Sequence, residues 1–237
     1  MIASSSLPSF HPTPMQPIRD YYDALAPTYD RDRFENSYGR YVDGMERALL
    51  RAWLRERDPE TVVDLACGTG RLLDFAMTGV DLSPAMLARA REKWPDRRLV
   101  QADAAHTGLP AASFDAATCF HLLMHLDAAA CAAILGEAAR LVRPGGNLIV
   151  DVPSAPRRRL SRRPASGWHG DNAASLADVR GWAGDAWRLK RRRGIVSLPI
   201  HRVPPGWRTA FGGLDALVGR TPLARWSSYY VCELERR

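Results

Sequence analysis

The chain has 237 residues, of which 46% are hydrophobic and 25% are charged. These proportions match average globular usage, so they exclude a largely disordered or fibrous protein, and the length suits one large domain. The formal net charge of +7 comes mostly from arginine, because Lys93 and Lys190 are the only lysines. Such a charge is compatible with polyanion binding, but we interpret most of it as a solvated surface.

Membrane insertion, export and a disulfide framework are not expected. No apolar run approaches the roughly 18–20 residues of a membrane-spanning helix, and residues 1–17 lack the basic start and apolar block of a leader. The four cysteines are too scattered for a disulfide scaffold, and none forms a C-x-x-C pair that would suggest zinc. We therefore expect a cytoplasmic chain with no membrane span and no bound metal.

Taken in chain order, residues 1–17 are rich in serine and proline, which predicts a mobile tail. Residues 18–56 carry tyrosines and aliphatic residues at helical spacing, with breaks near Pro27 and Asn36, which predicts a helical lid. Short apolar runs then alternate with helical patterns. The predicted strands are 61–66, 78–81, 98–102, 114–120 and 147–152, and the predicted helices between them are 84–94 and 127–142.

This alternation of strands and helices predicts an α/β protein with a parallel sheet between two helical layers. Residues 154–226 form a looser, arginine- and proline-rich stretch, which we interpret as partly inserted elements of the acceptor site. The patterns beyond residue 152 predict helices near 175–187 and 206–218, a strand near 187–198 and a last strand over 227–235. Because the final strands need a sheet edge, we predict a single domain over 18–237.

The most informative segment is the run 62–71, in which an apolar strand enters a glycine-rich turn, with a helix expected to follow. Gly68 and Gly70 lack a Cβ, so the backbone can turn tightly and present its N–H groups to a ligand. A G-x-G pair alone is weak evidence. The dinucleotide fingerprint also requires a third glycine where this chain has Leu73, so the pattern of a pyrophosphate site fails.

Three acidic residues stand at predicted strand ends. Asp64 would repel a pyrophosphate but would accept a hydrogen bond from an ammonium group. Asp81 ends the next strand before a helix capped by Ser83, where its carboxylate can accept both hydroxyls of a ribose. Asp103 ends the third strand and can accept the exocyclic amine of an adenine. The three together predict an adenosine that bears an amino acid and no phosphate.

At these residues the sequence resembles class I S-adenosylmethionine-dependent methyltransferases, in particular the small-molecule group that includes ubiquinone C-methyltransferases and natural-product methyltransferases. The resemblance implies S-adenosylmethionine as the cofactor and a Rossmann-like, doubly wound, mostly parallel sheet with an antiparallel last strand. It also implies a set of cofactor-binding positions in this sequence: Asp64, Ala66, Gly68 and Gly70 for the methionyl part, Asp81 for the ribose, and Leu82, Met86, Asp103, Ala104 and Phe120 around the adenine and the cofactor.

One departure from the family pattern concerns the first crossover. Only eleven positions separate Gly70 from Asp81, so the predicted crossover helix must be very short. Asp74 lies nearby as another carboxylate, but Asp81 alone stands between an apolar strand end and a helix cap. We therefore retain Asp81 as the ribose-binding residue.

The acceptor side is predicted from the loop after the fourth strand and from the lid. His121 and His125 are candidates for acceptor contact or proton abstraction, since a neutral imidazole suits that role near pH 7; His125 could instead serve the start of the next helix. In the lid, Tyr29 is the best candidate for facing the sulfonium, and Arg40 is a candidate partner of the methionyl carboxylate. Further candidates are Tyr21, Tyr22, Tyr38, Tyr41, Trp168, His169, Trp207 and Tyr229.

The sequence therefore predicts an enzyme that transfers a methyl group by in-line displacement to oxygen, nitrogen or carbon of a small acceptor, in bacterial secondary or quinone-type metabolism. Two alternatives remain: an RNA or protein methyltransferase that uses the arginine clusters at 157–163 and 188–193, and a non-catalytic cofactor-binding protein. Nucleic acid is the less favoured partner. We expect a monomer or a homodimer.

Overall fold

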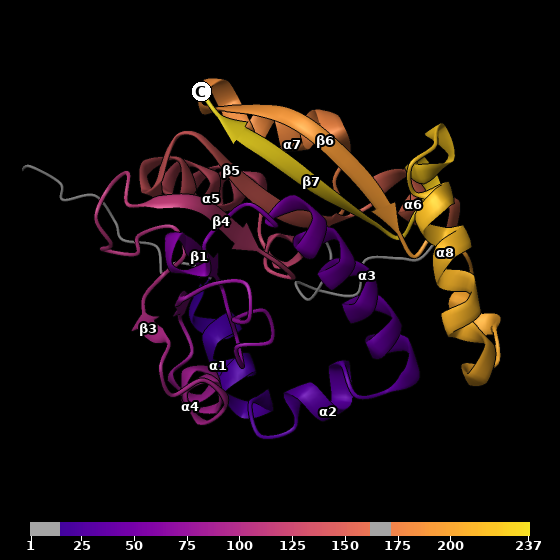
Figure 1. Ribbon diagram of the computed structural model, residues 1–237, viewed down its shortest axis with the longest axis horizontal. Helices are drawn as coiled ribbons and strands as arrows, with labels where there is room; N and C mark the ends of the chain where they lie inside the picture. The colour runs from indigo at the N-terminus through magenta and orange to yellow at the C-terminus, as the bar shows by residue number, and fades with distance from the viewer. Residues whose placement is uncertain (1–14, 162–171) are drawn as a thin grey trace, which may run out of the picture.

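The computed structural model describes residues 15–161 and 172–237, and the described strands form one seven-stranded sheet of order β3-β2-β1-β4-β5-β7-β6 (Figure 1). Strand β7 runs antiparallel to both of its neighbours, and the pairs from β3 to β5 are parallel. The predicted fold class is therefore confirmed. The strands are β1 (Val62–Leu65), β2 (Thr78–Asp81), β3 (Arg98–Gln101), β4 (Phe114–Cys119), β5 (Val142–Pro153), β6 (Trp187–Ile195) and β7 (Tyr229–Arg236).

The helices lie close to their predicted positions, and polar side chains cap the starts of several of them. The α-helices are α1 (Met15–Leu25), α2 (Tyr29–Arg33), α3 (Ser37–Trp53), α4 (Pro84–Lys93), α5 (Ala128–Leu141), α6 (Ala155–Ser161), α7 (Leu176–Ala183) and α8 (Arg208–Val218). Asn36, Ser83 and Asp127 accept hydrogen bonds from the first turns of α3, α4 and α5, the usual role of these residue types. Helix α1 begins three residues before the end of the predicted tail, so that boundary was placed too late.

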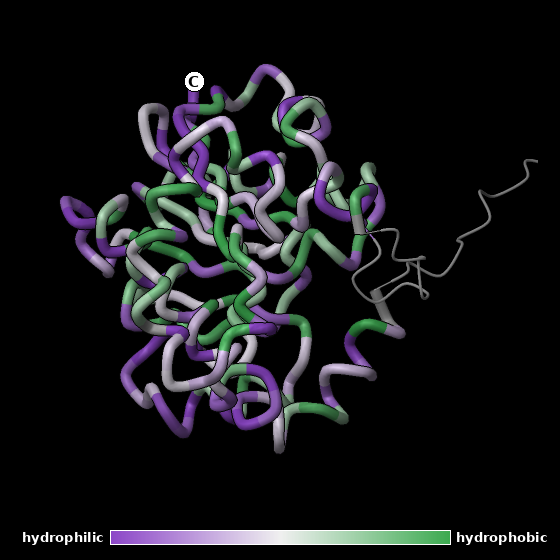
Figure 2. Tube along the Cα trace, turned by 90° about the vertical axis from the view of Figure 1, so that its right-hand side faces the viewer, coloured by the Kyte–Doolittle hydropathy of each residue, from purple (hydrophilic) through white to green (hydrophobic). Residues whose placement is uncertain are grey.

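Alternating residues along the strands separate two apolar layers. Val63 and Leu65 pack with α5 and α7 on one face of the sheet, whereas Val62 packs with α3 and α4 on the other. This follows from the two-residue period of a strand, and burial on both faces explains the continuous apolar runs of the central strands. Figure 2 shows the hydrophobic segments running through the middle of the molecule, with many of the most hydrophilic segments in outer turns.

Two local predictions differ from the structure. No helix forms between β1 and β2; instead, residues 68–74 make successive turns, with i to i+3 hydrogen bonds such as Gly70 N–H to Cys67 C=O at 2.9 Å. The crossover is too short to lay a full helix across the sheet, and tight turns satisfy its backbone groups instead. Strand β5 also begins five residues before the predicted 147, because Val142 already pairs with Phe114.

The sheet order places β1 between β2 and β4, with the carboxyl ends of all three at one edge. In an open α/β sheet, ligands bind at this edge, where the strand order reverses. The N-terminal helices lie near this edge (Figure 1). Among the described residues, no helix combines the length and the apolar character needed to cross a bilayer.

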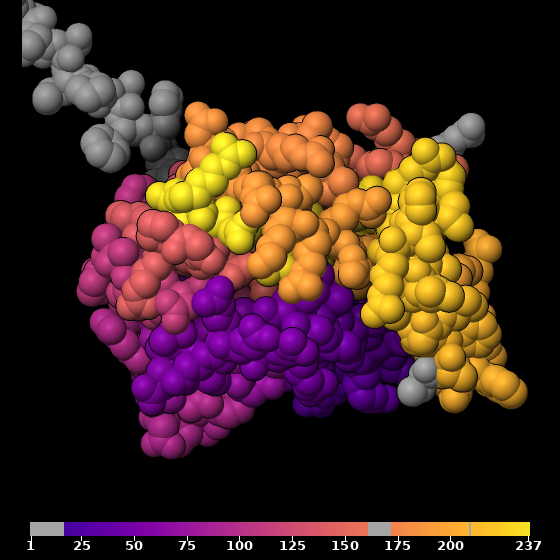
Figure 3. All heavy atoms as spheres, turned by 45° about the horizontal axis from the view of Figure 1, so that its top comes forward, coloured from indigo at the N-terminus to yellow at the C-terminus, as the bar shows by residue number. Residues whose placement is uncertain are grey.

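The elements after β5 extend the same sheet. Strand β6 pairs with β7 at the edge, and α8 packs against both α3 and β6. Figure 3 shows side chains of β6, in orange, resting against the purple N-terminal helices, with the yellow segment that includes α8 along the flank. This arrangement brings residues of the predicted insertion, 154–226, to the same side of the sheet as helix α3.

Candidate active site

A narrow cavity opens at the carboxyl ends of β1, β2 and β4. It encloses about 70 Å³, and a second cavity of about 40 Å³ adjoins it. Both are lined by Tyr29, Ala66, Gly68, Phe120 and His121, so the predicted glycine loop, lid and fourth-strand loop converge here. Four further predicted cofactor residues line the larger cavity, namely Asp81, Leu82, Met86 and Ala104, and Asp64 lines the smaller one.

The backbone of the glycine loop is held in an uncommon conformation. Ala66, Gly68 and Gly70 have φ values of 59°, 55° and 76°, which glycine adopts freely and alanine does not. A Cβ added to Gly70 would lie 2.9 Å from Cδ1 of Trp94. The indole of Trp94 also donates to the Gly70 carbonyl at 2.7 Å. Gly70 thus shapes the loop from behind, although it does not line the two cavities.

Asp81 is fixed beneath the loop by two backbone donors. The N–H of Gly68 donates to one carboxylate oxygen at 2.7 Å, and the N–H of Ser83 donates to the other at 2.9 Å. Burial raises the pKa of Asp81 to about 6, although the hydrogen bonds from these two donors act to lower it. A carboxylate has about four acceptor positions, so capacity remains for ribose hydroxyls.

Asp64 and Asp103 differ in environment. Asp64 is 3% exposed and accepts from the Thr118 hydroxyl at 2.6 Å; burial raises its pKa to about 7. A cation such as an ammonium group would favour its charged form. Asp103 is half-buried, accepts from the backbone of Ala105 at 2.8 Å and does not line the cavity, where its neighbour Ala104 does. Its role as an adenine contact therefore stays a prediction.

The lid helices are attached to the loops by specific polar contacts. Asp30 accepts from the Thr69 hydroxyl at 2.6 Å, and Asp23 pairs with the Ser83 hydroxyl. The Tyr22 hydroxyl lies 2.9 Å from Nε2 of His125, so His125 contacts the lid and does not line either cavity. These contacts hold the predicted lid helices against the loops that line the site.

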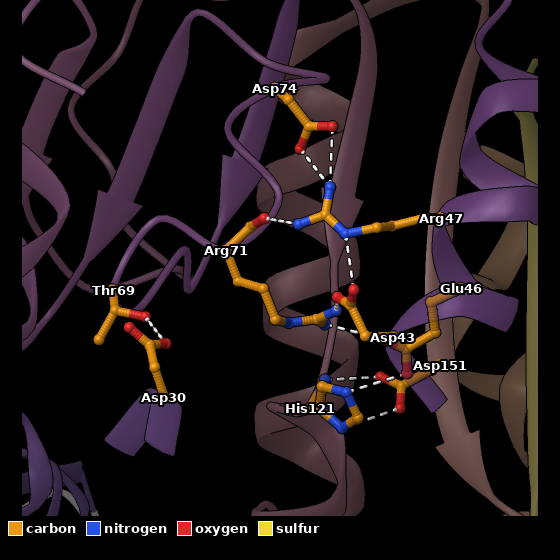
Figure 4. Close-up of polar contacts among 9 residues, drawn as sticks. All are labelled: Asp30, Asp43, Glu46, Arg47, Thr69, Arg71, Asp74, His121 and Asp151. Atoms are coloured by element: carbon orange, nitrogen blue, oxygen red, sulfur yellow. Dashed lines mark hydrogen bonds and ion pairs between the residues drawn. The ribbon is translucent and has the colours of Figure 1, made fainter. Parts of the chain in front are cut away.

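His121 lies between two buried carboxylates, in a network that the sequence did not predict (Figure 4). Its Nε2 lies 3.0 Å from Glu46 of α3, and its Nδ1 lies 3.5 Å from Asp151 of β5. The His121 backbone N–H also donates to Asp151 at 2.6 Å, with φ at 58°. Arg71 completes the network at 2.8 Å from Glu46 and 2.6 Å from Asp43.

The network favours a charged imidazole. Burial by itself would lower the pKa of His121, but the charges of Glu46 and Asp151 outweigh burial and raise it. Glu46 is fully buried, and burial would raise its pKa, yet His121 and Arg71 lower it below its usual range. The raised pKa of His121 disfavours the neutral imidazole that the predicted role of a base requires.

The same three ligand atoms of Glu46, His121 and Asp151 lie within 4.8 Å of one another, close enough for a divalent cation by distance alone. Within the described residues, neither Glu46 oxygen, His121 Nε2 nor Asp151 Oδ2 completes a well-aligned hydrogen bond. However, an added cation would face Arg71 at its 2.8 Å contact with Glu46. A proton on His121 also faces Arg71, but it adds a single charge between the two buried carboxylates.

Arg40 is not part of this site, contrary to our prediction. It is exposed, bonds to the Glu35 carbonyl and lines a separate cavity of about 730 Å³ between α3, β6 and α8. It precedes Glu46 by six residues, so it lies about 9 Å earlier along the helix axis. Arg71 instead lines the smaller cavity, with its guanidinium 4.3 Å from the Phe34 ring centroid.

The remaining candidates divide between the site and the surface. Tyr229 lies beside His121, with ring centroids 6.3 Å apart. Tyr41 instead donates to Asp215 at 2.8 Å, and Trp207 is 67% exposed. Asp74 pairs with Arg47 at 2.8 Å, which supports the choice of Asp81 for the ribose. Trp168 and His169 lie outside the described residues.

Comparison with known proteins agrees with this geometry. A family model described as a methyltransferase domain matches residues 63–150. A trans-aconitate 2-methyltransferase of Methylobacterium radiotolerans is 32% identical over 189 residues, which cover 73% of this chain and 70% of that protein. A demethylmenaquinone methyltransferase of Beutenbergia cavernae is 38% identical over 145 residues, 59% of each chain.

Among solved structures, the magnesium protoporphyrin IX methyltransferase of Synechocystis with bound SAH matches with a TM-score of 0.66 and 18% identity, over 93% of this chain and 98% of that one. This likeness concerns the fold. The matches to the first curated relatives span 59% to 66% of their own length. The sequence match over most of the chain and the loop geometry agree: the chain belongs to the class I S-adenosylmethionine-dependent methyltransferase family.

Proposed function

We propose that this protein transfers a methyl group from S-adenosylmethionine to a small organic acceptor. One observation carries the proposal. A strained glycine loop, a carboxylate held at the end of β2 and a tyrosine of the lid meet in one cavity. The curated relatives are named for a quinone precursor and for aconitate, both small molecules.

The residues present fit such a cofactor. Asp81 would hold the ribose, Leu82 and Met86 would pack on the adenine, and Asp64 with the Gly68 loop would hold the methionyl part. When bound there, S-adenosylmethionine supplies an electrophilic methyl group on a sulfonium. Tyr29 remains a neutral phenol, because burial raises its pKa to about 12, so its ring is available to a cation without a charged oxygen.

The main contribution of the protein is then orientation and exclusion of water, which together account for about 7–11 kcal/mol of barrier reduction in well-aligned systems. The lid contacts of Tyr22 and Asp30 keep water out of the closed site. His121 is held between two carboxylates that raise its pKa. We therefore propose that it positions the acceptor and the lid, and that the acceptor arrives with a nucleophile that needs no strong base.

Methylation of nucleic acid is not favoured. In the second arginine cluster, Arg188 pairs with Glu235, and Lys190 and Arg191 share Glu233, so two carboxylates of β7 offset part of the charge of β6. Such pairing reduces the charge available to phosphates.

The proposal is tested by calorimetry with S-adenosylmethionine, S-adenosylhomocysteine and NADH. We expect heat with the first two and none with NADH. Asp81→Ala should weaken cofactor binding at least tenfold. Asp74→Ala is the matched control, because Asp74 pairs with Arg47 outside the cavity; it should leave cofactor binding unchanged. Binding of NADH alone would contradict the proposal.

A second measurement separates an enzyme from a non-catalytic binding protein. Transfer of labelled methyl from S-adenosylmethionine is followed over a panel of phenols, amines, indoles and organic acids. We expect transfer to at least one acceptor class. Cofactor binding without transfer to any compound would favour the non-catalytic alternative.

A further inference from the structure

A large cavity lies on the acceptor side of His121. It encloses about 710 Å³ and is lined by residues from β5, α6, β7 and the segment after β6. This volume is typical of small-molecule sites, whereas the cofactor cavities enclose about 70 and 40 Å³. Tyr229 lines the cavity and lies 6.3 Å from His121 between ring centroids, so the cavity adjoins the place where the methyl group is expected.

The described lining of this cavity contains basic residues and no acidic ones. Its described lining includes Arg157 and Arg158 of α6, with His201 and Arg202 of the short 3₁₀ helix η4 (Ile200–Arg202), and no aspartate or glutamate. Within the described part of the chain, the guanidinium groups of Arg157 and Arg202 have no carboxylate within ion-pairing distance. Arginines without a counterion at a concave surface attract anions, and their planar fork matches a carboxylate.

The backbone segments that carry these cations are held by buried anchors. Ser154 begins α6 directly after β5; its backbone N–H donates to Ser228 C=O at 3.0 Å, and its hydroxyl donates to Arg225 C=O at 3.1 Å. On the opposite wall, Ile200 is fully buried at the start of η4. The cavity is therefore organised before a ligand arrives, which lowers the cost of binding.

Backbone strain also gathers around this side of the molecule. In the described residues, four non-glycine residues have positive φ: Ala66, Ala112, His121 and Val196. Two of them line the cofactor cavities, and Val196, with φ at 54°, lines the arginine-lined cavity. The Val196 carbonyl accepts from both the N–H and the hydroxyl of Ser228, at 3.1 and 3.0 Å. Such strain is typical of functional sites.

We infer that the acceptor is a small carboxylic acid whose carboxylate is held by Arg157 and Arg202, while its opposite end reaches Tyr229 and His121. This inference rests on the proposed methyl transfer and names the acceptor class for it. His121 lies beside Tyr229, and its imidazole is flanked by Glu46 and Asp151, so the attraction for a carboxylate comes from the arginines. The arginines thus select the acceptor by charge, and the lid selects the cofactor.

The test uses calorimetry on the full chain loaded with S-adenosylhomocysteine. The probes are trans-aconitate, benzoate, benzamide as the neutral match of benzoate, and phenyl phosphate. We expect at least one carboxylate to bind and benzamide to bind at least tenfold more weakly than benzoate. In Arg157→Gln with Arg202→Gln, carboxylate binding should fall about tenfold or more. Arg55→Gln with Arg188→Gln is the control of equal charge change, since these arginines pair with Glu56 and Glu235 and do not line the cavity.

The outcomes separate this inference from the proposed function. Failure of S-adenosylhomocysteine to bind would contradict the methyltransferase proposal itself. If S-adenosylhomocysteine binds, the carboxylate inference alone is overturned by any of three results: no carboxylate binds, the double variant binds carboxylates as the wild type does, or only phenyl phosphate binds. A melting temperature within about 2 °C of wild type shows that the double variant remains folded, so that weakened binding reports on the arginines.

Discussion

Replacing Glu46 tests the buried network most directly. In Glu46→Gln the side chain keeps its shape but loses the charge that faces His121 at 3.0 Å and Arg71 at 2.8 Å. Glu46 is fully buried, so the two cations lose a partner that water does not replace. Removing one member of a buried ion pair costs about 3–5 kcal/mol. We expect about 3 kcal/mol, the lower end of that range, because the amide retains an oxygen acceptor.

For a chain of this size, each kcal/mol shifts the melting temperature by about 2–4 °C, so Glu46→Gln should melt about 6–12 °C below wild type. Scanning calorimetry and urea unfolding measure the change. Glu56→Gln is the matched control, because Glu56 pairs with Arg55 while 80% of its side chain is exposed. Exposed pairs contribute little, so the control should melt close to wild type.

The stability lost in Glu46→Gln should depend on pH, because both His121 and Glu46 titrate. The pKa of His121 is raised above 6.5, so its contribution is complete below that pH and is lost as pH rises through the folded-state pKa. The pKa of Glu46 is lowered below 4.5, so its contribution is present above that pH and is lost as pH falls through the folded-state pKa. The stability gap between wild type and Glu46→Gln should be widest at about pH 4.5–6.5. A constant gap from pH 4 to 10, or a loss no larger than in Glu56→Gln, would refute the charged network.

Three further predictions concern the cofactor side. Gly70→Ala should destabilise the protein by about 1–3 kcal/mol in urea unfolding and weaken S-adenosylmethionine binding, since φ is 76° and the new Cβ would lie 2.9 Å from Trp94. Gly44→Ala is the control: it lies inside α3 with no atom within 4 Å of the new Cβ, so its stability in urea should be equal to wild type or higher. Tyr22→Phe removes the 2.9 Å contact that attaches α1, so hydrogen exchange in α1 should quicken while the sheet is unaffected; equal protection in both proteins would exclude a lid role. Burial raises the pKa of Asp64 from 3.8 to about 7, so wild-type stability should fall relative to Asp64→Asn as pH rises from about 4 to 7, measured by urea unfolding; a rise with pH would contradict this environment.

The glycine loop and the residues around it could be predicted because their signal is local. Val62 to Gly70 are consecutive, so neighbouring residues alone predict a strand that ends in a tight turn. Asp81, Leu82 and Met86 follow the next strand end in the same way, and all three line the cavity. The prediction of a helix between β1 and β2 was wrong for a physical reason. In so short a segment, tight turns satisfy the backbone hydrogen bonds better than a helix does.

The acceptor side was predicted less well, because its residues come from distant parts of the chain. His121 was correctly placed at the cavity, but its charge depends on Glu46 of α3 and Asp151 of β5, and no spacing in the sequence joins them. His125 was a candidate for acceptor contact, with a role at the start of the next helix as the alternative, and in the structure it contacts Tyr22 of the lid. Arg40 was chosen for its type and its lid position, yet α3 presents its middle turn to the site.

The sequence by itself determined the class of fold, the cofactor and the loop that receives it, because strand periodicity and the glycine turn act over a few adjacent residues. Only the tertiary structure decided the charge of His121 and the arginine-lined cavity beside Tyr229. A protonation state depends on every charge within a few ångströms, and a cavity exists only where separate elements pack. The protonation state and the cavity both depend on distances between residues that are far apart in the sequence, and these distances exist only once the chain has folded.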